Sequence, residues 1–302
     1  MSDLGHFIGI DWGSTNARAL LFASDGKILE ERDEPLGIKH VSPGGHRAAF
    51  EKLTAGWRER HGPIPALLSG MIGSRTGWRE APYVAAPANL TELHRTLVPA
   101  PDVENVWIVP GVSLATTRCD VMRGEELQLL GLGARAAEFD WVCIPGTHSK
   151  WIRAEWPFVR EFHTAMTGET FAAIAEHTLF AQLIPPVKPG SVWGKPAFQS
   201  GLERSAPPHG LLNSLFGIRA DLLLGRIQAT EVADLISGLV IGTEINHVRS
   251  LTQVGSRVAL LAAPGLQSRY ECALAFFDFA PTAFDVRALN ADGFRQLMRS
   301  RS

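Results

Sequence analysis

Apolar and polar positions follow the same order at the start of each half of the chain. Residues 7–12 and 16–23 have the pattern of apolar strands separated by a short turn of small polar residues, and 27–33 predicts a third strand after the hairpin signal Asp25-Gly26. Residues 141–156, WVCIPGTHSKWIRAEW, repeat the strand–turn–strand order. This internal repeat predicts two halves that fold alike.

Helical and strand-like segments are interleaved along the rest of the chain. Helical spacing is found over 46–62, over 124–139, from about Gly168, near 210–226, over 230–250 and after Pro264-Gly265. Short apolar runs that predict strands cover 65–73, 106–111 and 258–263, and a Pro-rich loop covers 184–197. We therefore expect an α/β protein with two domains, residues 1–138 and 139–302.

Composition and charge exclude several classes of protein. The 302 residues include 29 Lys plus Arg against 31 Asp plus Glu, so no overall field attracts nucleic acid or an anionic membrane. Cys119, Cys143 and Cys272 form no CxxC pair, and the N-terminal residues lack the basic region of a signal peptide. We expect a cytoplasmic protein without nucleic-acid or membrane partners; a homodimer is left open.

The two polar turns are the first candidates for a binding site. Backbone N–H groups in tight Gly/Ser/Thr turns form concave anion sites, because several donors converge where no side chain blocks the approach. Two such turns facing one another across a cleft would grip a polyphosphate. Asp11, beside the first turn, would repel a bare phosphate and favours Mg²⁺. The alternative is that both turns are structural hairpins and Asp11 bonds its own turn.

Longer blocks of sequence carry a family resemblance. IGIDWGSTNARALLF and IPGTHSKW resemble the two phosphate motifs of the sugar kinase, heat-shock chaperone and actin superfamily. Four blocks together resemble the 2-dehydro-3-deoxygalactonokinase family: SGMIGSRTGWREAPYV (69–84), DVMRGEELQLLGL (120–132), PGTHSKW (145–151) and FHTAMTGETFA (162–172). The resemblance implies two actin-like (ribonuclease H-like) ATPase domains, each a mixed β-sheet flanked by helices, around a cleft. It also implies transfer of phosphate from ATP to the 6-hydroxyl of 2-dehydro-3-deoxy-D-galactonate.

The resemblance assigns ATP and Mg²⁺ to particular residues. Asp11 would hold Mg²⁺. The phosphate contacts would be Gly13, Ser14, Thr15 and Asn16 in the first domain and Gly146, Thr147 and His148 in the second. Ala263 and Gly265 would contact adenosine, although many superfamily members have a double glycine where this chain has LLAAPGLQSRY.

The sequence leaves open which carboxylate accepts the proton of the attacking hydroxyl. Glu125-Glu126 opens a predicted helix, where the helix dipole favours acids whether or not they catalyse a reaction. A kinase needs a carboxylate to orient the attacking hydroxyl and accept its proton. Related exopolyphosphatases have a Gly-Glu-Glu stretch at the catalytic position, and sugar kinases commonly use Asp. Glu125 and Asp120 are therefore both candidates.

A carboxylate substrate favours recognition by a guanidinium group. Arg75, in the loop GSRTGW, and Arg123, beside the acid pair, are the candidates, and Ser74 and Trp78 complete the expected sugar-acid site. The alternatives are a surface charge for either arginine and core packing for Trp78.

Two other functional classes share these patterns. A polyphosphate or nucleotide phosphatase would contain the same turns but would transfer phosphate to water. A sugar-sensing regulator would keep the fold and lack catalysis, and such proteins usually carry a DNA-binding extension that we do not expect here.

Overall fold

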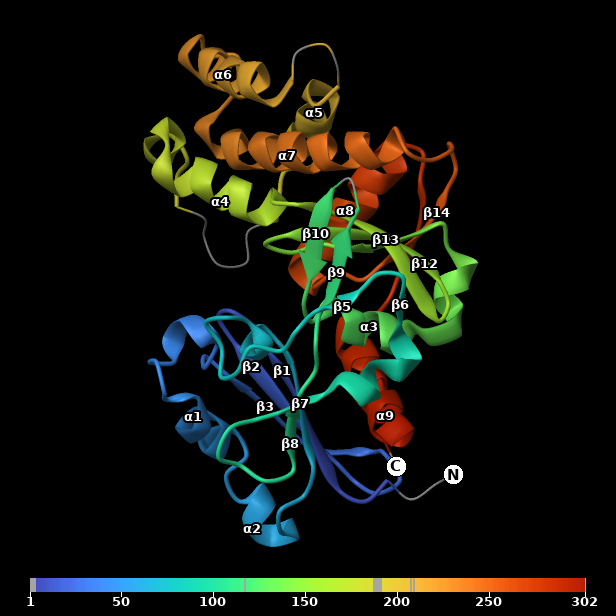
Figure 1. Ribbon diagram of the computed structural model, residues 1–302. Coiled ribbons are helices and arrows are strands. Elements are labelled where there is room, and N and C mark those ends of the chain that lie inside the picture. The colour runs from blue at the N-terminus through green and yellow to red at the C-terminus, as the bar shows by residue number, and fades with distance from the viewer. Residues whose placement is uncertain (1–3, 117, 187–191, 207, 209, 302) are drawn as a thin grey trace. The chain divides into compact units, whose positions relative to one another are not determined.

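The two strand–turn–strand repeats form where the sequence predicts them. In the first, β1 (Phe7–Trp12) and β2 (Ala17–Phe22) pair antiparallel, and β3 (Ile28–Glu34) pairs with β2. In the second, β11 (Trp141–Ile144) and β12 (Ser149–Glu155) pair antiparallel around the second turn. The internal repeat read from the sequence is therefore confirmed (Figure 1).

The computed structural model describes residues 4–116, 118–186, 192–206, 208 and 210–301, so part of the Pro-rich loop, 187–191, lies outside the described residues. The chain divides into two units. The first contains Met1–Glu138, Arg153–Phe162 and Asp285–Ser302, and the second contains Phe139–Ile152 and His163–Phe284. The first unit thus runs without interruption to Glu138 and takes in two later segments of the chain.

The first unit is built on a six-stranded sheet with the order β3-β2-β1-β4-β8-β7. Its later strands are β4 (Ala66–Gly70), β7 (Val98–Pro99) and β8 (Val106–Ile108). A smaller sheet contains β5 (Val84–Ala85), β9 (Val112–Ala115) and β10 (Cys119–Met122). β6 (Ala88–Asn89) pairs with the start of β13 (Phe158–Ala165). The small sheet was absent from the sequence prediction.

Helices α1 (His46–Leu53) and α2 (Trp57–His61) pack their buried Phe50 and Trp57 against the first sheet. The sequence predicted one helix over 46–62. The chain instead breaks at Gly56, whose φ of 78° lies in the left-handed region and cannot continue a helix. The predicted helix over 124–139 is also shorter, because α3 (Glu125–Leu132) ends where Gly133 adopts a φ of 60°.

Helix α9 (Val286–Arg301) packs against α3 in the first unit, although it follows the whole second unit in the sequence (Figure 1). The two helices approach closely because each has a glycine at the crossing. A Cβ on Gly131 would lie 1.9 Å from the carbonyl oxygen of Leu289, and one on Gly293 would lie 2.2 Å from that of Leu127. This backbone contact explains why Asp285–Ser302 belongs to the first unit.

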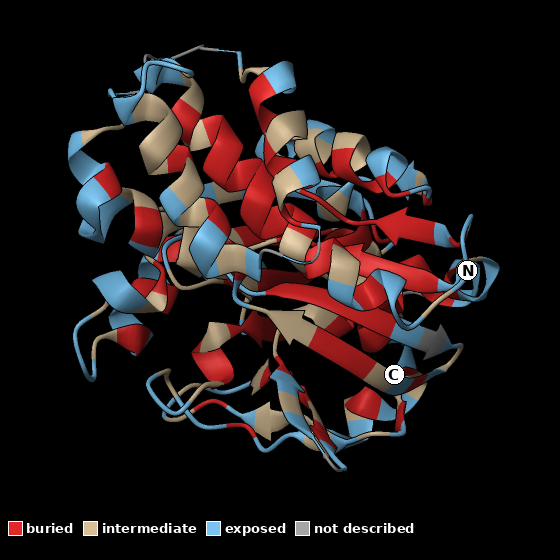
Figure 2. Ribbon diagram, turned by 90° about the horizontal axis from the view of Figure 1, so that it is seen from above, coloured by how far each residue is buried: buried red, intermediate tan, exposed pale blue. Residues whose placement is uncertain are grey.

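The second unit places β14 (Arg257–Leu260) and β15 (Ala280–Ala283) parallel to β11, in the order β15-β14-β11-β12. Its helices are α4 (Thr167–His177), α5 (Lys195–Arg204), α6 (Gly210–Leu223), α7 (Val232–Arg249) and α8 (Pro264–Phe276). Helix α7 is buried along most of its length and forms the core with Trp141, Trp151 and Phe198. Figure 2 shows that most strand residues are buried, whereas many helices keep an exposed side.

Candidate functional site

The first turn, Gly13–Asn16, is held by its carbonyl oxygens. The N–H groups of Gly37, Ile38 and Lys39 donate to the carbonyls of Thr15, Gly13 and Ser14 at 2.9–3.1 Å. A Cβ on Gly37 would lie 2.2 Å from the carbonyl carbon of Thr15, so only glycine allows this contact. In the part of the chain that the structure describes, the N–H groups of Ser14 and Thr15 have no hydrogen-bond acceptor. The turn can therefore donate to an anion.

Asp11 is the fifth residue of β1, directly before this turn. One carboxylate oxygen, Oδ2, accepts a hydrogen bond of 2.9 Å from Nδ2 of Asn290 on α9. Burial raises the pKa of Asp11 above its usual value, and the Arg18 charge and the Asn290 bond oppose that rise. A cavity of about 300 Å³ lies beside Asp11 and is also lined by Glu31 and Arg287. Asp11 does not bond its own turn, which was the alternative role.

The N-terminus of α3 lies at the ends of β1 and β4. Gly70 ends β4 and Gly124 precedes α3, with φ values of 90° and 110° that favour glycine. A Cβ on Gly70 would lie 3.5 Å from Oδ1 of Asp11, and one on Gly124 would lie 3.4 Å from Cα of Gly70. The acid pair at the start of α3 is therefore brought close to Asp11.

The two acids of this pair have different environments. Glu126 is fully buried, and its carboxyl accepts from the Gly124 N–H at 2.8 and 2.9 Å and from Ser69 Oγ at 3.5 Å. Burial and the neighbouring Glu125 charge raise the pKa of Glu126 to about 8. Glu125 is only partly buried, and its Oε2 accepts from the N–H of Arg123 at 2.8 Å. Glu125 is the member of the pair that can meet a substrate.

Asp120, the other candidate base, lies on β10 in the small sheet, whereas Glu125 begins α3. Its Oδ1 accepts from the N–H of Val121 at 2.8 Å, and its Oδ2 lies 3.7 Å from Nη2 of Arg118. The Asp120 side chain is 11% exposed. The contacts described for Asp120 are therefore with its own strand and with the Arg118 guanidinium.

The expected sugar-acid residues have unequal exposure. The Arg75 side chain is 88% exposed, and its Nε lies 3.8 Å from Oε1 of Glu80. Ser74 Oγ lies 3.3 Å from the hydroxyl of Thr76. Trp78 packs at the edge of the core with its ring centroid 5.7 Å from that of Phe50. The structure thus leaves Arg75 accessible to a ligand, and the core contact of Trp78 agrees with its structural alternative.

Arg123 is fixed from two sides. Its Nη2 donates to the carbonyl oxygen of Ala81 at 2.7 Å, and its guanidinium lies 4.3 Å from the ring centroid of Tyr83. Its Nε and Nη1 are buried without a hydrogen-bond acceptor among the described residues. Unsatisfied buried donors are rare and require an explanation, such as a ligand or water. Two donors of Arg123 are therefore left unsatisfied by the described residues.

The second turn is held by the start of α4. The N–H of Glu169 donates to the carbonyl of Thr147 at 3.0 Å, and Oε2 of Glu169 lies 2.5 Å from Nε2 of His148. A Cβ on Gly168 would lie 2.5 Å from the carbonyl oxygen of Gly146. A Cβ on Gly146 itself would meet only His148 O, at 4.0 Å, so the outer side of Gly146 is open.

The expected adenosine residues lie at the N-terminus of α8. Ala263 precedes this helix and Gly265 is its second residue, and both are exposed. No atom lies within 4 Å of a Cβ placed on Gly265. The backbone at this position can therefore be approached closely by a ligand.

Neither a metal-binding cluster nor a membrane-spanning helix is found in the described part of residues 4–301. It contains no group of three or more His, Cys, Asp or Glu side chains that could hold a metal ion. None of its helices has both the length and the apolar character needed to cross a membrane.

Three residues important for this geometry were missed by the sequence prediction. Gly37 and Gly168 each support a turn, and Asn290 binds Asp11. The FHTAMTGETFA block included Gly168 without suggesting its role. Asn290 carried no local signal, because it is 279 residues from its partner.

Comparisons with known proteins agree with these features. The profile of the 2-keto-3-deoxy-galactonokinase family matches residues 11–297. The chain is 35% identical to the 2-dehydro-3-deoxygalactonokinase of Escherichia coli (strain K12), over 95% of this chain and 93% of that protein. It is 33% identical, with a TM-score of 0.86, to a crystal structure from Sinorhizobium meliloti titled "putative 2-dehydro-3-deoxygalactonokinase protein", over 97% and 98% of the two chains. A xylulose kinase from Lactobacillus acidophilus has a TM-score of 0.50 at 9% identity over 98% of this chain and 89% of that one. The expected actin-like α/β fold class is confirmed.

The pKa of Glu126 predicts a pH-dependent stability. The folded carboxyl keeps its proton to about pH 8, whereas the unfolded one loses it near 4.5, so stability falls as pH rises through this window. Glu126→Gln cannot titrate. As pH rises, its free energy of unfolding should therefore increase relative to that of the wild type, by up to about 1.4 kcal/mol per pH unit. Urea unfolding from pH 6 to 9 measures the difference. The exposed Glu138→Gln is the control and should show none; parallel curves for Glu126→Gln would contradict the buried, protonated carboxyl.

Proposed function

The chain belongs to the 2-keto-3-deoxy-galactonokinase family, and we propose that it transfers the γ-phosphoryl group of ATP to the 6-hydroxyl of 2-keto-3-deoxy-D-galactonate. The observation that supports this most strongly is the match over residues 11–297, which includes both phosphate turns. The three cysteines are free, which is consistent with a reducing cytoplasm. The activity is that of a sugar-acid kinase in galactonate catabolism.

ATP fits the donors that the chain offers. We assign the phosphates to the first turn, Gly13–Asn16, with the N–H groups of Ser14 and Thr15 as donors, because the carbonyls of Gly13, Ser14 and Thr15 are bonded to the Gly37–Lys39 segment and the N–H of Gly13 already donates to the carbonyl of Asn16. The open outer side of Gly146 allows the second turn to contact the phosphates, together with Thr147 and His148. The exposed backbone at Ala263 and Gly265 is assigned to adenosine.

Magnesium fits the same site through Asp11. Mg²⁺ is usually bound by one or two carboxylates, water and substrate phosphates rather than by a cage of protein ligands. Asp11 supplies one carboxylate at the end of β1, and the described residues contain no group of three or more acidic, His or Cys side chains that could form such a cage. When bound, Mg²⁺ supplies positive charge that stabilises the transferring phosphoryl group.

We assign the proton acceptor to Glu125. Phosphoryl transfer requires mainly that two oxygens be held in line and that charge be neutralised. As the sugar hydroxyl bonds to the γ-phosphorus and the bond to ADP breaks, its proton passes to the carboxylate. Glu125 starts α3 directly after Gly124, which packs on Gly70 next to Asp11, whereas Asp120 lies on β10. This difference in position favours Glu125.

The carboxylate of the sugar acid is assigned to Arg75 and Arg123. Arg75 is accessible, and Arg123 retains two buried N–H donors beside Tyr83. A guanidinium binds a carboxylate through two parallel hydrogen bonds, which fixes the orientation of the substrate. Ser74 and Trp78 belong to the same loop as Arg75 and are assigned to the wall of the sugar site.

A coupled ADP-release assay with a panel of 2-keto-3-deoxy sugar acids tests the activity. We expect ADP release to require the sugar acid and to favour the galactonate over its gluconate epimer. Phosphate release from ATP without any sugar acid would instead support the phosphatase alternative. An equal rate with the two epimers would contradict the proposed substrate.

Asp11→Asn tests the magnesium assignment. The variant keeps the shape of the side chain and an oxygen for the Asn290 bond but removes the charge, so kcat should fall about 100-fold or more with normal folding. Asp33→Asn is a matched control, because it removes the charge of a second carboxylate that faces Arg18, from β3 on the other side of β2. Steady-state kinetics over a Mg²⁺ titration, with thermal melting, measure both.

Near-wild-type kcat in folded Asp11→Asn would contradict the metal role.

In the same assay, Glu125→Gln should lower kcat strongly and Asp120→Asn weakly, and the reverse order would transfer the role of the base to Asp120.

Arg75→Ala tests recognition of the sugar acid. We expect the KM for the sugar acid to rise by about tenfold or more and the KM for ATP to change little, because the substrate carboxylate loses a charged partner. Arg79→Ala is the control: Arg79 is exposed in the same segment and donates to the carbonyl of Pro99. Equal effects on both substrates, or none, would make Arg75 a surface charge.

A further inference from the structure

We propose that Glu244, a buried acid on α7, is a positioning residue that holds the second phosphate turn in its ATP-binding conformation. The proposal rests on the proposed function, because it assigns ATP to that turn. Glu244 lies outside every sequence motif considered above and is only 6% exposed. Its side chain bonds to residues of three elements in the second unit. Two of these residues, Thr167 and Tyr270, connect it to the turn.

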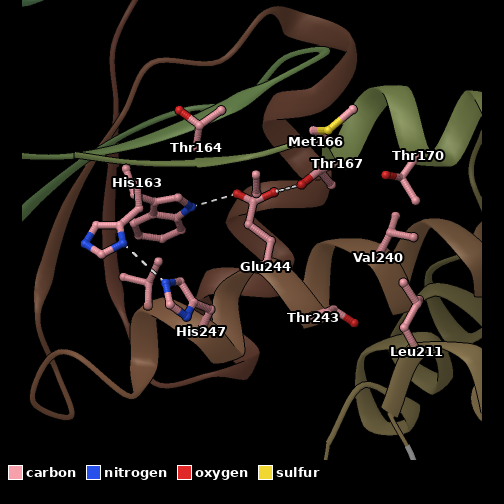
Figure 3. Close-up of a pocket in the computed structure, with 13 residues that line it drawn as sticks. His163, Thr164, Met166, Thr167, Thr170, Leu211, Val240, Thr243, Glu244 and His247 are labelled. Carbon is pink, nitrogen blue, oxygen red and sulfur yellow. Dashed lines mark hydrogen bonds between the residues drawn. The ribbon is translucent and has the colours of Figure 1, made fainter. Parts of the chain in front are cut away.

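The carboxylate of Glu244 accepts hydrogen bonds from Trp151, Thr167 and Tyr270. Oε1 accepts from Nε1 of Trp151 on β12 at 2.7 Å. Oε2 accepts from the hydroxyl of Thr167 on α4 and, at 2.8 Å, from the hydroxyl of Tyr270 on α8. Figure 3 shows the Glu244 carboxylate directed between Thr167 and the indole ring beside it. One buried acid thus fixes a strand and two helices.

The first connection to the turn passes through Thr167. This residue begins α4, and the next two residues are those that touch the turn. Gly168 packs against the carbonyl of Gly146, and the Glu169 N–H donates to the carbonyl of Thr147. A shift of Thr167 would therefore move both contacts.

The second connection passes through Tyr270. Its hydroxyl oxygen lies 3.0 Å from Oγ of Ser149, and both side chains are buried. Ser149 directly follows His148, the last residue of the turn. Glu244 therefore supports the turn at its C-terminal end through Tyr270, as it supports the carbonyl side through Thr167.

The chemistry of the cluster requires an acceptor at this position. Burial raises the pKa of Glu244, whereas the bonds from Thr167, Trp151 and Tyr270 lower it. Trp151 can only donate, so an oxygen must face it whatever the charge on Glu244. Removing an acceptor leaves buried donors unpaired, which costs more than the bond itself contributes. The neighbours of Glu244 must then rearrange, and the turn depends on two of them.

The cavity beside Glu244 provides a matched control. This cavity of about 280 Å³ is also lined by Thr243, whose hydroxyl donates to the carbonyl of Leu239 within α7. Thr243→Val removes a hydroxyl from the same cavity without touching the Glu244 cluster. The control separates a general effect on this cavity from an effect on the turn.

The test measures ATP affinity without the sugar acid, by titration calorimetry in the presence of Mg²⁺. We expect Glu244→Gln and Thr167→Val each to weaken ATP binding by about fivefold or more, and Tyr270→Phe to act in the same direction. Thr167→Ser keeps the hydroxyl and should restore wild-type affinity. Thr243→Val should leave ATP affinity unchanged, and the KM for the sugar acid should be unchanged in all five variants.

The outcomes separate this proposal from the proposed function. Variants that melt at a lower temperature but bind ATP like the wild type would overturn the positioning role and leave a purely structural cluster. An equal rise in the KM for the sugar acid would also overturn it. A wild-type chain without affinity for ATP would overturn both proposals. If Glu244→Gln does not fold, Thr167→Val and Tyr270→Phe each remove a single bond and carry the test.

Discussion

Direct contact between two stretches of backbone determines the shape of each of the two polar turns. Gly37 packs on Thr15 in the first unit and Gly168 packs on Gly146 in the second, and a Cβ at either glycine would overlap the turn. In each case the glycine follows its partner by 22 residues (37 − 15 and 168 − 146) and comes after the third strand. The internal repeat therefore includes the support of the turn as well as the turn. Since the hydrogen bonds that hold the first turn use its carbonyl oxygens, the N–H groups of Ser14 and Thr15 have no acceptor among the described residues.

Each unit also contains a buried acid close to a helix N-terminus, and the two acids are stabilised differently. Glu126 lies beside a second acid, Glu125, and its raised pKa keeps Glu126 protonated at neutral pH. Glu244 has donors from three side chains. Buried polar groups of this kind favour one arrangement of the surrounding elements when all their bonds are made. Both acids fix the position of a helix that begins beside a candidate site.

The sequence predicted the local features and missed those made by distant contacts. Strands β1 to β3, β11 and β12, together with both turns, follow from alternation and turn chemistry within a few residues. The break at Gly56 needs a backbone angle that glycine allows but does not require. The α3–α9 crossing and the Asn290 bond join residues more than 150 positions apart, which no window of sequence reveals. The exposure of Arg75 and the burial of Glu126 depend in the same way on tertiary packing.

The position of α9 at the end of the chain also affects the order in which the two units can fold during synthesis. Ribosomes add roughly 5–20 residues per second, and domains generally fold as they emerge. Here the second unit is complete before α9 is translated, whereas the first unit must wait for its last helix, although most of it is synthesised first. During that delay Asp11 lacks its Asn290 partner and α3 exposes the apolar face that α9 later covers. The packing of the first unit therefore cannot be completed until the chain is nearly fully synthesised.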